Sequence, residues 1–544
     1  MSTVNVTALI VFIILFVAVA SIGFYAARWR RGDLNLLNEW GLAGRRFGTV
    51  VSWFLLGGDL YTAYTFIAVP ALLFGTGANG FFAVPYTIIV YPFVFLVMPK
   101  LWSVAKKHGY VTAADFVHGR YDSKGLSLAV AFTGILATMP YIALQLIGIQ
   151  VVIAALGIGG TGNGFASDLP LIIAFIILAA YTYTSGLRAP AMIALVKDVL
   201  IYATIIAAVI IIPIHLGGYG AIFAKAGAAL HKSKVSTLLL SPQYFGYATL
   251  ALGSALALFM YPHSVTGVLS TNSRNVIKRN AALLPAYSFL LGLIALLGYM
   301  ALAADISAKT PAYAASFKIY GNQFAVPALF LNQFQGADWF IGFAFAAIAI
   351  GALVPAAVMS IAASNLFTRN VYRAYFRPNA SDREEANAAK LVSLLVKFGA
   401  LLFIFFAPVQ YAINLQLLGG IWIIQTLPAI VIGLYTRWFH RIGLIVGWAL
   451  GMISGTWMSY YSQGFIAGGK VQAPIIQYPV AAHPVSILGV SLPTGYIAVY
   501  AVVINLVVAA ILTLVFNAVG VRGGADATAA ADYDEEPVAV GAAV

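Results

Sequence analysis

Apolar segments of about twenty residues recur along nearly the whole 544-residue chain. A helix needs about 20 such residues to cross the hydrocarbon core of a bilayer, whereas a barrel strand needs about ten residues of alternating polarity. The sequence therefore predicts an all-α polytopic membrane protein. We expect thirteen transmembrane helices, near residues 6–28, 49–74, 79–104, 126–156, 169–187, 190–216, 243–270, 280–304, 337–371, 390–408, 411–436, 440–462 and 494–519.

The basic residues predict how the helices are oriented. The first apolar run lacks the positive start of a signal peptide and is followed by Arg28, Arg30 and Arg31. Because cytoplasmic loops are enriched in Lys and Arg, we expect the N-terminus outside and the C-terminus in the cytoplasm of a bacterial-type plasma (inner) membrane. The net charge of +13 then reflects topology, with the lipid bilayer as the partner and no nucleic acid.

Several classes of function are disfavoured by what the sequence lacks. It has no cysteine, and it shows no His/Cys metal pattern, no phosphate-binding glycine loop and no catalytic dyad. We therefore expect a transporter driven by an ion gradient, and neither an enzyme nor a protein with an obligatory protein partner. A sensory membrane protein is a weaker alternative, because the short acidic C-terminal stretch does not resemble a kinase domain.

The stretch LLGGDLYTAYTF (residues 55–66) interrupts the second apolar run with Gly57, Gly58 and Asp59. Glycine disfavours a helix interior, and a charge in the membrane core usually marks a functional site. We expect the helix to unwind here, so that freed carbonyls hold a small cation and the following half-helix points its positive end at an anionic solute. The alternative is a close Gly-Gly packing contact, with Asp59 hydrogen-bonded to a neighbour.

The ninth apolar run, which contains ALVPAAVMSIAASNLFTRNVYRAY, places Ser360 and Ser364 on one helix face. Pro355 and its small neighbours favour a close approach by another helix. These hydroxyls are suitable further ligands for a cation, although serines in membrane helices often bond back to their own backbone.

Four segments together resemble the sodium:solute symporter family in order and spacing: GGDLYTAYTFIAVPALLFGTG, TAADFVHGRYDSKG, AAVMSIAASNLFTRNVY and YAINLQLLGGIWIIQTLPAIVIGLYTRW. The resemblance implies a LeuT-type core of two inverted five-helix repeats with one extra N-terminal helix and two extra C-terminal helices. The implied parts are an N-terminal helix with a basic inner loop (1–48), the first repeat (49–216), an outer loop (217–242), the second repeat (243–436), two C-terminal helices (437–519) and a disordered acidic cytoplasmic tail (520–544).

Carried over position by position, the resemblance implies a sodium site made by the carbonyls of Gly57, Leu60 and Ala357 and the hydroxyl of Ser360. The family usually offers a second hydroxyl at the next position, which is Ile361 here. Hard cations require several oxygen ligands, so this loss weakens the site. Sodium is the expected coupling ion, and the proton is the alternative.

Two aspartates are implied in ion coupling. Asp59 matches an acidic position of the proline-transporting branch of the family and would carry the proton in the alternative mechanism. Asp198 resembles the family's aspartate on the inner ion-release path, although its spacing differs by about one helical turn. Lys197 is expected to point about 100° away from Asp198, so a lipid-facing Lys197 beside a solvated Asp198 is the competing interpretation.

The solute is expected at the midplane, between two broken helices. The candidate solute-binding residues are Thr62, Tyr64, Thr65, Tyr141, Gln145, Phe259 and Gln416. The first three offer hydroxyls after the break, and Tyr141 and Gln145 share a helix face. The resemblance implies solute contacts for Tyr64 and Gln416 and an inner aromatic gate for Phe259. Each polar residue has the alternative of a buried interhelical hydrogen bond.

The pattern resembles the monocarboxylate branch of the family. We therefore expect a symporter that couples inward Na⁺ movement to uptake of a small organic anion such as lactate or pyruvate. The alternatives are H⁺-coupled uptake, or a Na⁺ symporter for another small solute such as proline, acetate, pantothenate or a sugar.

Overall fold

The computed structural model describes residues 4–29, 32–158, 165–232, 235–406, 412–461, 486–487, 490–521 and 523–534. In this part of the chain ten helices are long and apolar enough to cross a membrane, or eleven if one bent pair is counted as a single span. The shorter apolar helix Thr49–Gly58 comes in addition. The protein is a multi-pass membrane protein, although the expected number of thirteen spans is not confirmed.

The helices of the first half of the chain are α1 (Val6–Tyr25), α2 (Leu37–Leu42), α3 (Thr49–Gly58), α4 (Val69–Thr76), α5 (Ala83–His108), α6 (Ala113–Tyr121), α7 (Lys124–Ala155), α8 (Phe165–Ser185), α9 (Arg188–Leu216), α10 (Tyr219–His231), α11 (Tyr244–Leu258) and α12 (Pro262–Leu269). Side-chain caps fix several helix starts. Asn5 accepts from the Ala8 N–H, and Thr112 forms a capping box with Asp115.

The second half contains α13 (Arg274–Leu283), α14 (Pro285–Ala295), α15 (Leu297–Ala303), α16 (Ala314–Tyr320), α17 (Ala325–Gln333), α18 (Asp338–Phe367), α19 (Asp382–Phe406), α20 (Ala412–Ile423), α21 (Leu427–Ile430), α22 (Arg441–Tyr461) and α23 (Ile497–Ala518). A short antiparallel pair, β1 (Ser486–Ile487) and β2 (Val490–Ser491), lies between the last two helices. Two π-helices, η3 (Tyr64–Ala68) and η7 (Thr368–Phe376), interrupt the α-helical pattern.

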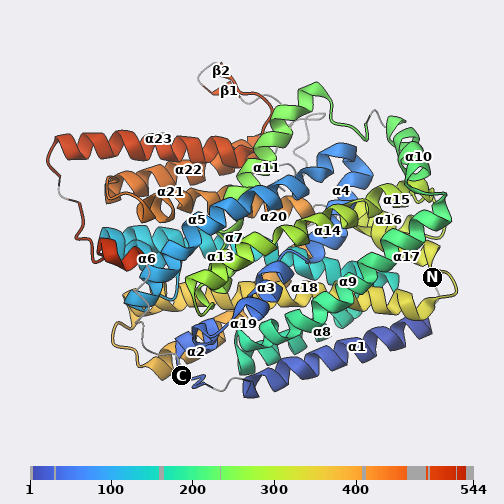
Figure 1. Cartoon of the computed structure of the whole chain (residues 1–544), viewed down its shortest axis with the longest axis horizontal. Coiled ribbons are helices and arrows are strands. Elements are labelled where there is room, and N and C mark those ends of the chain that lie inside the picture. The colour runs from blue at the N-terminus through green and yellow to red at the C-terminus, as the bar shows by residue number, and fades with distance from the viewer. Residues whose placement is uncertain are drawn as a thin grey trace.

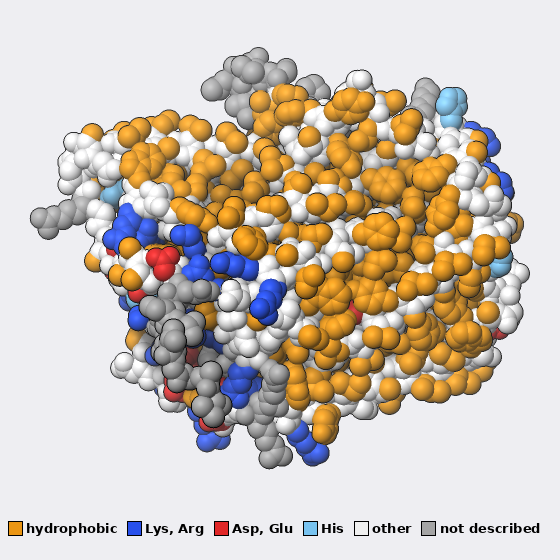
Figure 2. Space-filling view, viewed as in Figure 1, with side chains coloured by type: hydrophobic (Ala, Val, Ile, Leu, Met, Phe, Trp, Pro, Cys, Tyr) orange, Lys and Arg blue, Asp and Glu red, His pale blue; other side chains and the backbone are white. Residues whose placement is uncertain are grey.

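The helices pack as a bundle around α18, which is almost wholly buried. In Figure 1 α1 lies along one flank of the bundle and the paired helices α22 and α23 lie along the opposite flank. Hydrophobic side chains cover most of the face in Figure 2, and Lys and Arg gather at the end that carries α6. An apolar belt with charge concentrated at one end is the surface expected of a bundle embedded in lipid.

Two spans are broken. The first is α3, which ends at Gly58 and is followed after a short non-helical stretch by η3 and α4. The second consists of α11 and α12, which meet at an angle of 49°. Broken spans in corresponding places of two halves are typical of transporters with inverted repeats. The division into repeats at 49–216 and 243–436 remains a prediction.

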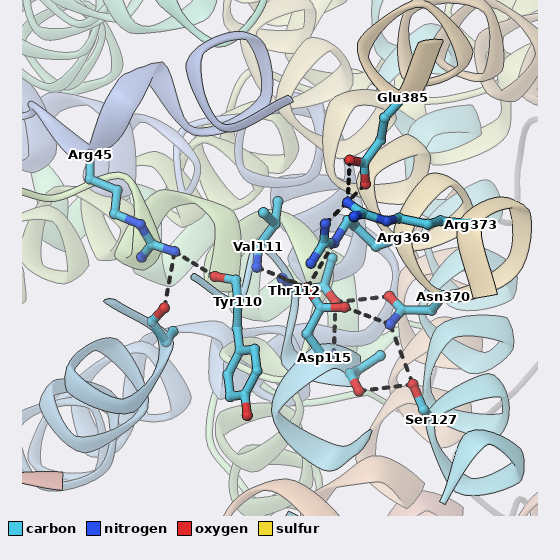
Figure 3. Close-up of polar contacts among 12 residues, drawn as sticks. Arg45, Tyr110, Val111, Thr112, Asp115, Ser127, Arg369, Asn370, Arg373 and Glu385 are labelled. Carbon is cyan, nitrogen blue, oxygen red and sulfur yellow. Dashed lines mark hydrogen bonds and ion pairs between the residues drawn. The ribbon is translucent and has the colours of Figure 1, made fainter. Parts of the chain in front are cut away.

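A buried ionic network joins the helices at the charged end (Figure 3). Asp115 accepts hydrogen bonds from the Asn370 amide at 2.8 Å and lies 3.4 Å from the Arg369 guanidinium. Arg369 and Arg373 both pair with Glu385, at 3.1 and 2.8 Å. Because these residues belong to α6, η7 and α19, the network ties three separate elements together.

The described part of the acidic tail differs from the expectation of disorder over residues 520–544, of which residues 522 and 535–544 lie outside the described chain. Residues 523–534 lie against the charged end of the bundle, where Asp526 pairs with Arg120 at 2.6 Å and with Arg437 at 3.0 Å. Composition alone suggested a solvated segment. The buried guanidinium of Arg120 requires a counter-charge, and Asp526 supplies it.

Candidate functional site

The break after α3 comes at the two adjacent glycines of the first broken span. A Cβ on Gly57 would lie 2.3 Å from the ring of Tyr287, so a side chain here would displace that ring. Residues 59–62 are not helical, and the chain resumes as η3 at Tyr64. The predicted interruption of the helix is therefore present, and its backbone is packed against α14.

Lys197 fills the space beside this break. Its ammonium group donates hydrogen bonds to the carbonyl oxygens of Gly58 and Tyr61, the latter at 3.1 Å. The same group lies 3.1 Å from a carboxylate oxygen of Asp198. Both side chains are 0% exposed, so the competing interpretation, a lipid-facing lysine beside a solvated aspartate, is wrong. A lysine side chain is long enough to turn back along α9 towards its neighbour.

Asp198 is held from its other side by aromatic residues. The Tyr287 hydroxyl donates to the second carboxylate oxygen of Asp198 at 2.6 Å. The Tyr61 hydroxyl donates to the Tyr287 carbonyl at 3.1 Å. These bonds connect α9 and α14 to the unwound stretch, so that Asp198 belongs to the framework of the break.

The four expected sodium ligands make hydrogen bonds within their own segments. The Gly57 carbonyl accepts from the Leu60 N–H at 2.9 Å, and the Leu60 carbonyl accepts from the Thr65 hydroxyl. On α18 the Ser360 hydroxyl donates to the Ala357 carbonyl at 2.8 Å. This is the back-bonding that was the alternative interpretation of the serines.

One contact places part of α18 beside the break. A Cβ on Gly351 would lie 3.6 Å from the Tyr61 carbonyl oxygen, which places that part of α18 beside the break. Ser360 comes nine residues later, about 13.5 Å along a helix. One turn after Gly351 stand Val354 and Pro355, which have no side-chain oxygen.

Ser360 instead takes part in a separate buried chain of polar groups. The Ser393 hydroxyl lies 3.4 Å from that of Ser360 and accepts a hydrogen bond from Lys397 at 2.7 Å. Lys397 is fully buried on α19. The basic group close to Ser360 is therefore Lys397, which reaches it through Ser393.

The second break faces the first. Asp59 lies 3.3 Å from His263, the second residue of α12. The His263 ring packs at 5.4 Å from Tyr141 and 5.3 Å from Tyr261, and Tyr261 donates to the Gln416 carbonyl at 3.0 Å. Asp59 thus connects the two broken spans. The sequence predicted only that two broken helices lie on either side of the solute.

Polar groups without partners gather between the breaks. Gln145 accepts from the Ala63 N–H at 3.1 Å through its oxygen, whereas its Nε2 is buried without a partner in the described part of the chain. Over the same residues the Gln416 Oε1 has no partner, and the Tyr64 hydroxyl faces Tyr86 without a hydrogen bond of normal geometry. Unpaired buried polar atoms are costly unless a ligand satisfies them.

The remaining candidates have other roles in the structure. Thr62 accepts from the Tyr64 N–H at 3.0 Å, and Thr65 caps the Leu60 carbonyl, so both hydroxyls shape the break. Phe259 is buried at the bend between α11 and α12.

Sequence reasoning missed Tyr287 and misjudged Lys197. A charged residue within a 29-residue apolar helix was the available signal for Lys197. Tyr287 offered no signal, because it is one of 29 tyrosines in the chain and only the packed fold selects it.

Comparisons with known proteins identify the family. A sequence profile of the sodium:solute symporter family matches residues 40–451. The chain is 59% identical to a monocarboxylate transport permease protein of Rhizobium johnstonii over 84% of this chain and 89% of the relative. It is 35% identical to the uncharacterized symporter YodF of Bacillus subtilis, over 82% and 88%.

A solved structure supports the fold. The substrate-bound, outward-open Na⁺-coupled sialic acid symporter superposes with a TM-score of 0.70, at 15% identity, over 96% of this chain and 99% of that one. The fold is thus the LeuT-type helical bundle. The chain belongs to the sodium:solute symporter family, a family of transporters and not of enzymes.

Proposed function

We propose that this protein is a secondary active symporter that takes up small monocarboxylates, such as lactate or pyruvate, together with a cation. The family membership supports symport. The monocarboxylate is supported by the Rhizobium relative at 59% identity and by the groups between the two breaks.

The observation on which the proposal chiefly rests is the free Nε2 of Gln145. This amide is a hydrogen-bond donor in a dry site and has no acceptor there in the described part of the chain. The Tyr64 hydroxyl is a second donor, and the eight-residue helix α12 begins nearby with the positive end of its dipole. Two donors and a helix N-terminus suit a carboxylate.

The surroundings suit a small solute with one charged end. Tyr141, Tyr261 and Phe259 supply buried rings around the breaks. Asp59 is the acidic residue closest to them, and His263 faces it at 3.3 Å.

The two breaks give the transport cycle its moving parts. Below the second break lies a small cavity of about 20 Å³, lined by Met260, Pro262, Ala362 and Leu366 among others. It has room for about one water molecule. We propose that α12 and the inner part of α18 separate here to release the solute.

The coupling ion and the orientation belong to this proposal. Sodium was the expected ion and the proton the alternative, and the sialic acid symporter of the same fold is Na⁺-coupled. We place the charged end, with α6 and residues 523–534, in the cytoplasm of the plasma membrane, because basic residues concentrate there.

Uptake of labelled lactate into cells expressing the protein tests the proposal. Unlabelled pyruvate and acetate are expected to compete, whereas proline, pantothenate and galactose are not. Strong competition by proline, with none by pyruvate, would contradict the substrate class. Lys225→Met, on the exposed face of α10, is a control variant that should transport normally.

A further inference from the structure

We propose that the ammonium group of Lys197 is a built-in cation that takes the place of a sodium ion at the first helix break, so that transport does not require Na⁺ there. The proposal deepens the function given above and rests on that function only for its uptake measurement. It concerns a place where the residues present do not fit the ion that the family name suggests.

The Lys197 ammonium occupies the space beside the unwound backbone. Unwinding of the helix frees backbone carbonyls that point at a common space. In this chain the carbonyls of Gly58 and Tyr61 point at the Lys197 nitrogen. A Cβ added to Gly58 would lie 2.9 Å from that nitrogen, so the ammonium is packed tightly against the break.

The part of α18 beside Tyr61 has no side-chain oxygen to offer a metal ion. Sodium, like other hard cations, requires several oxygens in its first shell. The segment of α18 beside the Tyr61 carbonyl offers Gly351, Val354 and Pro355, and none of these has a side-chain oxygen. Ser360, the hydroxyl expected to complete the site, bonds to its own helix and to Ser393.

The positive charge of Lys197 disfavours a metal ion at the break. A sodium ion beside the break would lie next to the Lys197 ammonium in a fully buried setting, where like charges repel strongly. Asp198 neutralises Lys197 at 3.1 Å and accepts from Tyr287 at 2.6 Å, while Asp59, the residue after Gly58, lies 3.3 Å from His263. Within this pair of Lys197 and Asp198 one negative charge balances one positive charge, so Asp198 offers a metal ion no unneutralised charge.

The direct test measures sodium binding without any solute. A ligand that binds the folded state raises the melting temperature in a concentration-dependent way. Purified protein in detergent is heated in NaCl and in choline chloride at equal ionic strength. We expect melting temperatures within 1 °C of each other from 1 to 300 mM salt. A saturable rise specific to Na⁺ would overturn the inference.

The second test measures uptake in proteoliposomes at fixed pH and membrane potential. We expect the initial rate of lactate uptake to change less than twofold when external Na⁺ is replaced by choline. A tenfold loss would contradict the inference. If no lactate is transported under any condition, the proposed substrate fails, and the melting experiment still decides the role of Lys197.

A variant adds a third readout. Lys197→Met should lower uptake at least tenfold, and added Na⁺ should not restore it, whereas Lys225→Met should behave as wild type. Wild-type uptake by Lys197→Met would overturn the inference. If Lys197→Met does not give a monodisperse protein, the two measurements on the wild type decide the question.

Discussion

Replacing Lys197 and Asp198 singly and together should reveal strong coupling between them. Lys197→Met leaves the Asp198 carboxylate buried with Tyr287 as its remaining partner and strips the Gly58 and Tyr61 carbonyls of their donor. Removing one partner of a buried ion pair costs about 3–5 kcal/mol. Asp198→Asn leaves an uncompensated ammonium and should cost a similar amount.

The double variant should cost much less than the sum. Once both charges are gone, the remaining penalty is that of two unpaired carbonyl groups, about 1–2 kcal/mol each. The singles would add up to about 6–10 kcal/mol, so the predicted coupling free energy is about 2 kcal/mol or more.

The assay is unfolding by SDS in mixed detergent micelles, with the free energy of unfolding compared among the four proteins of the cycle. A second cycle on Lys225 and Asp198, which lie on different helices, provides the control and should show no coupling. Additive costs for Lys197 and Asp198 would refute the account of the break as a neutralised ion pair.

Three further predictions concern the site and the tail. Tyr64→Phe should change the free energy of unfolding by no more than about 0.5 kcal/mol and weaken lactate binding about tenfold. Tyr287→Phe should lower the free energy of unfolding by about 1.5–3 kcal/mol, because its hydroxyl bonds to a carboxylate; melting and binding curves distinguish the two variants. Gly57→Ala should destabilise by about 1–3 kcal/mol through the clash with the Tyr287 ring, and a variant as stable as wild type would disprove that packing. Asp526→Asn should loosen the tail from Arg120 by about 1–2 kcal/mol and speed proteolysis there about 5–30-fold, and unchanged cleavage would contradict the docking.

The features that sequence predicted well are local ones. Adjacent glycines and an aspartate in an apolar run identify the broken helix, because glycine and charge are unfavourable there whatever the rest of the fold does. Tyr64 was identified from its place after the break and Gln145 from the helix face that it shares with Tyr141, and polar atoms of both have no partner among the described residues.

The features that sequence could not predict depend on how helices lie against one another. The resemblance paired Ser360 with the break, and this pairing stays a prediction. The structure sets Gly351 beside Tyr61, and the residues of α18 that face the break depend on the register of two packed helices. The direction of the Lys197 side chain was predicted from the helical angle alone, although its four-carbon chain lets the ammonium reach Asp198.

The most direct test of the central claim, that a carboxylate binds between the two breaks, is equilibrium binding of labelled pyruvate to purified wild-type protein and Gln145→Glu. The glutamate keeps the acceptor for the Ala63 N–H and replaces the free amide donor with a charge of the same sign as the solute. The account predicts saturable binding to wild type and at least a thirtyfold loss in the variant, with unchanged melting behaviour. Equal binding by the two proteins would contradict it.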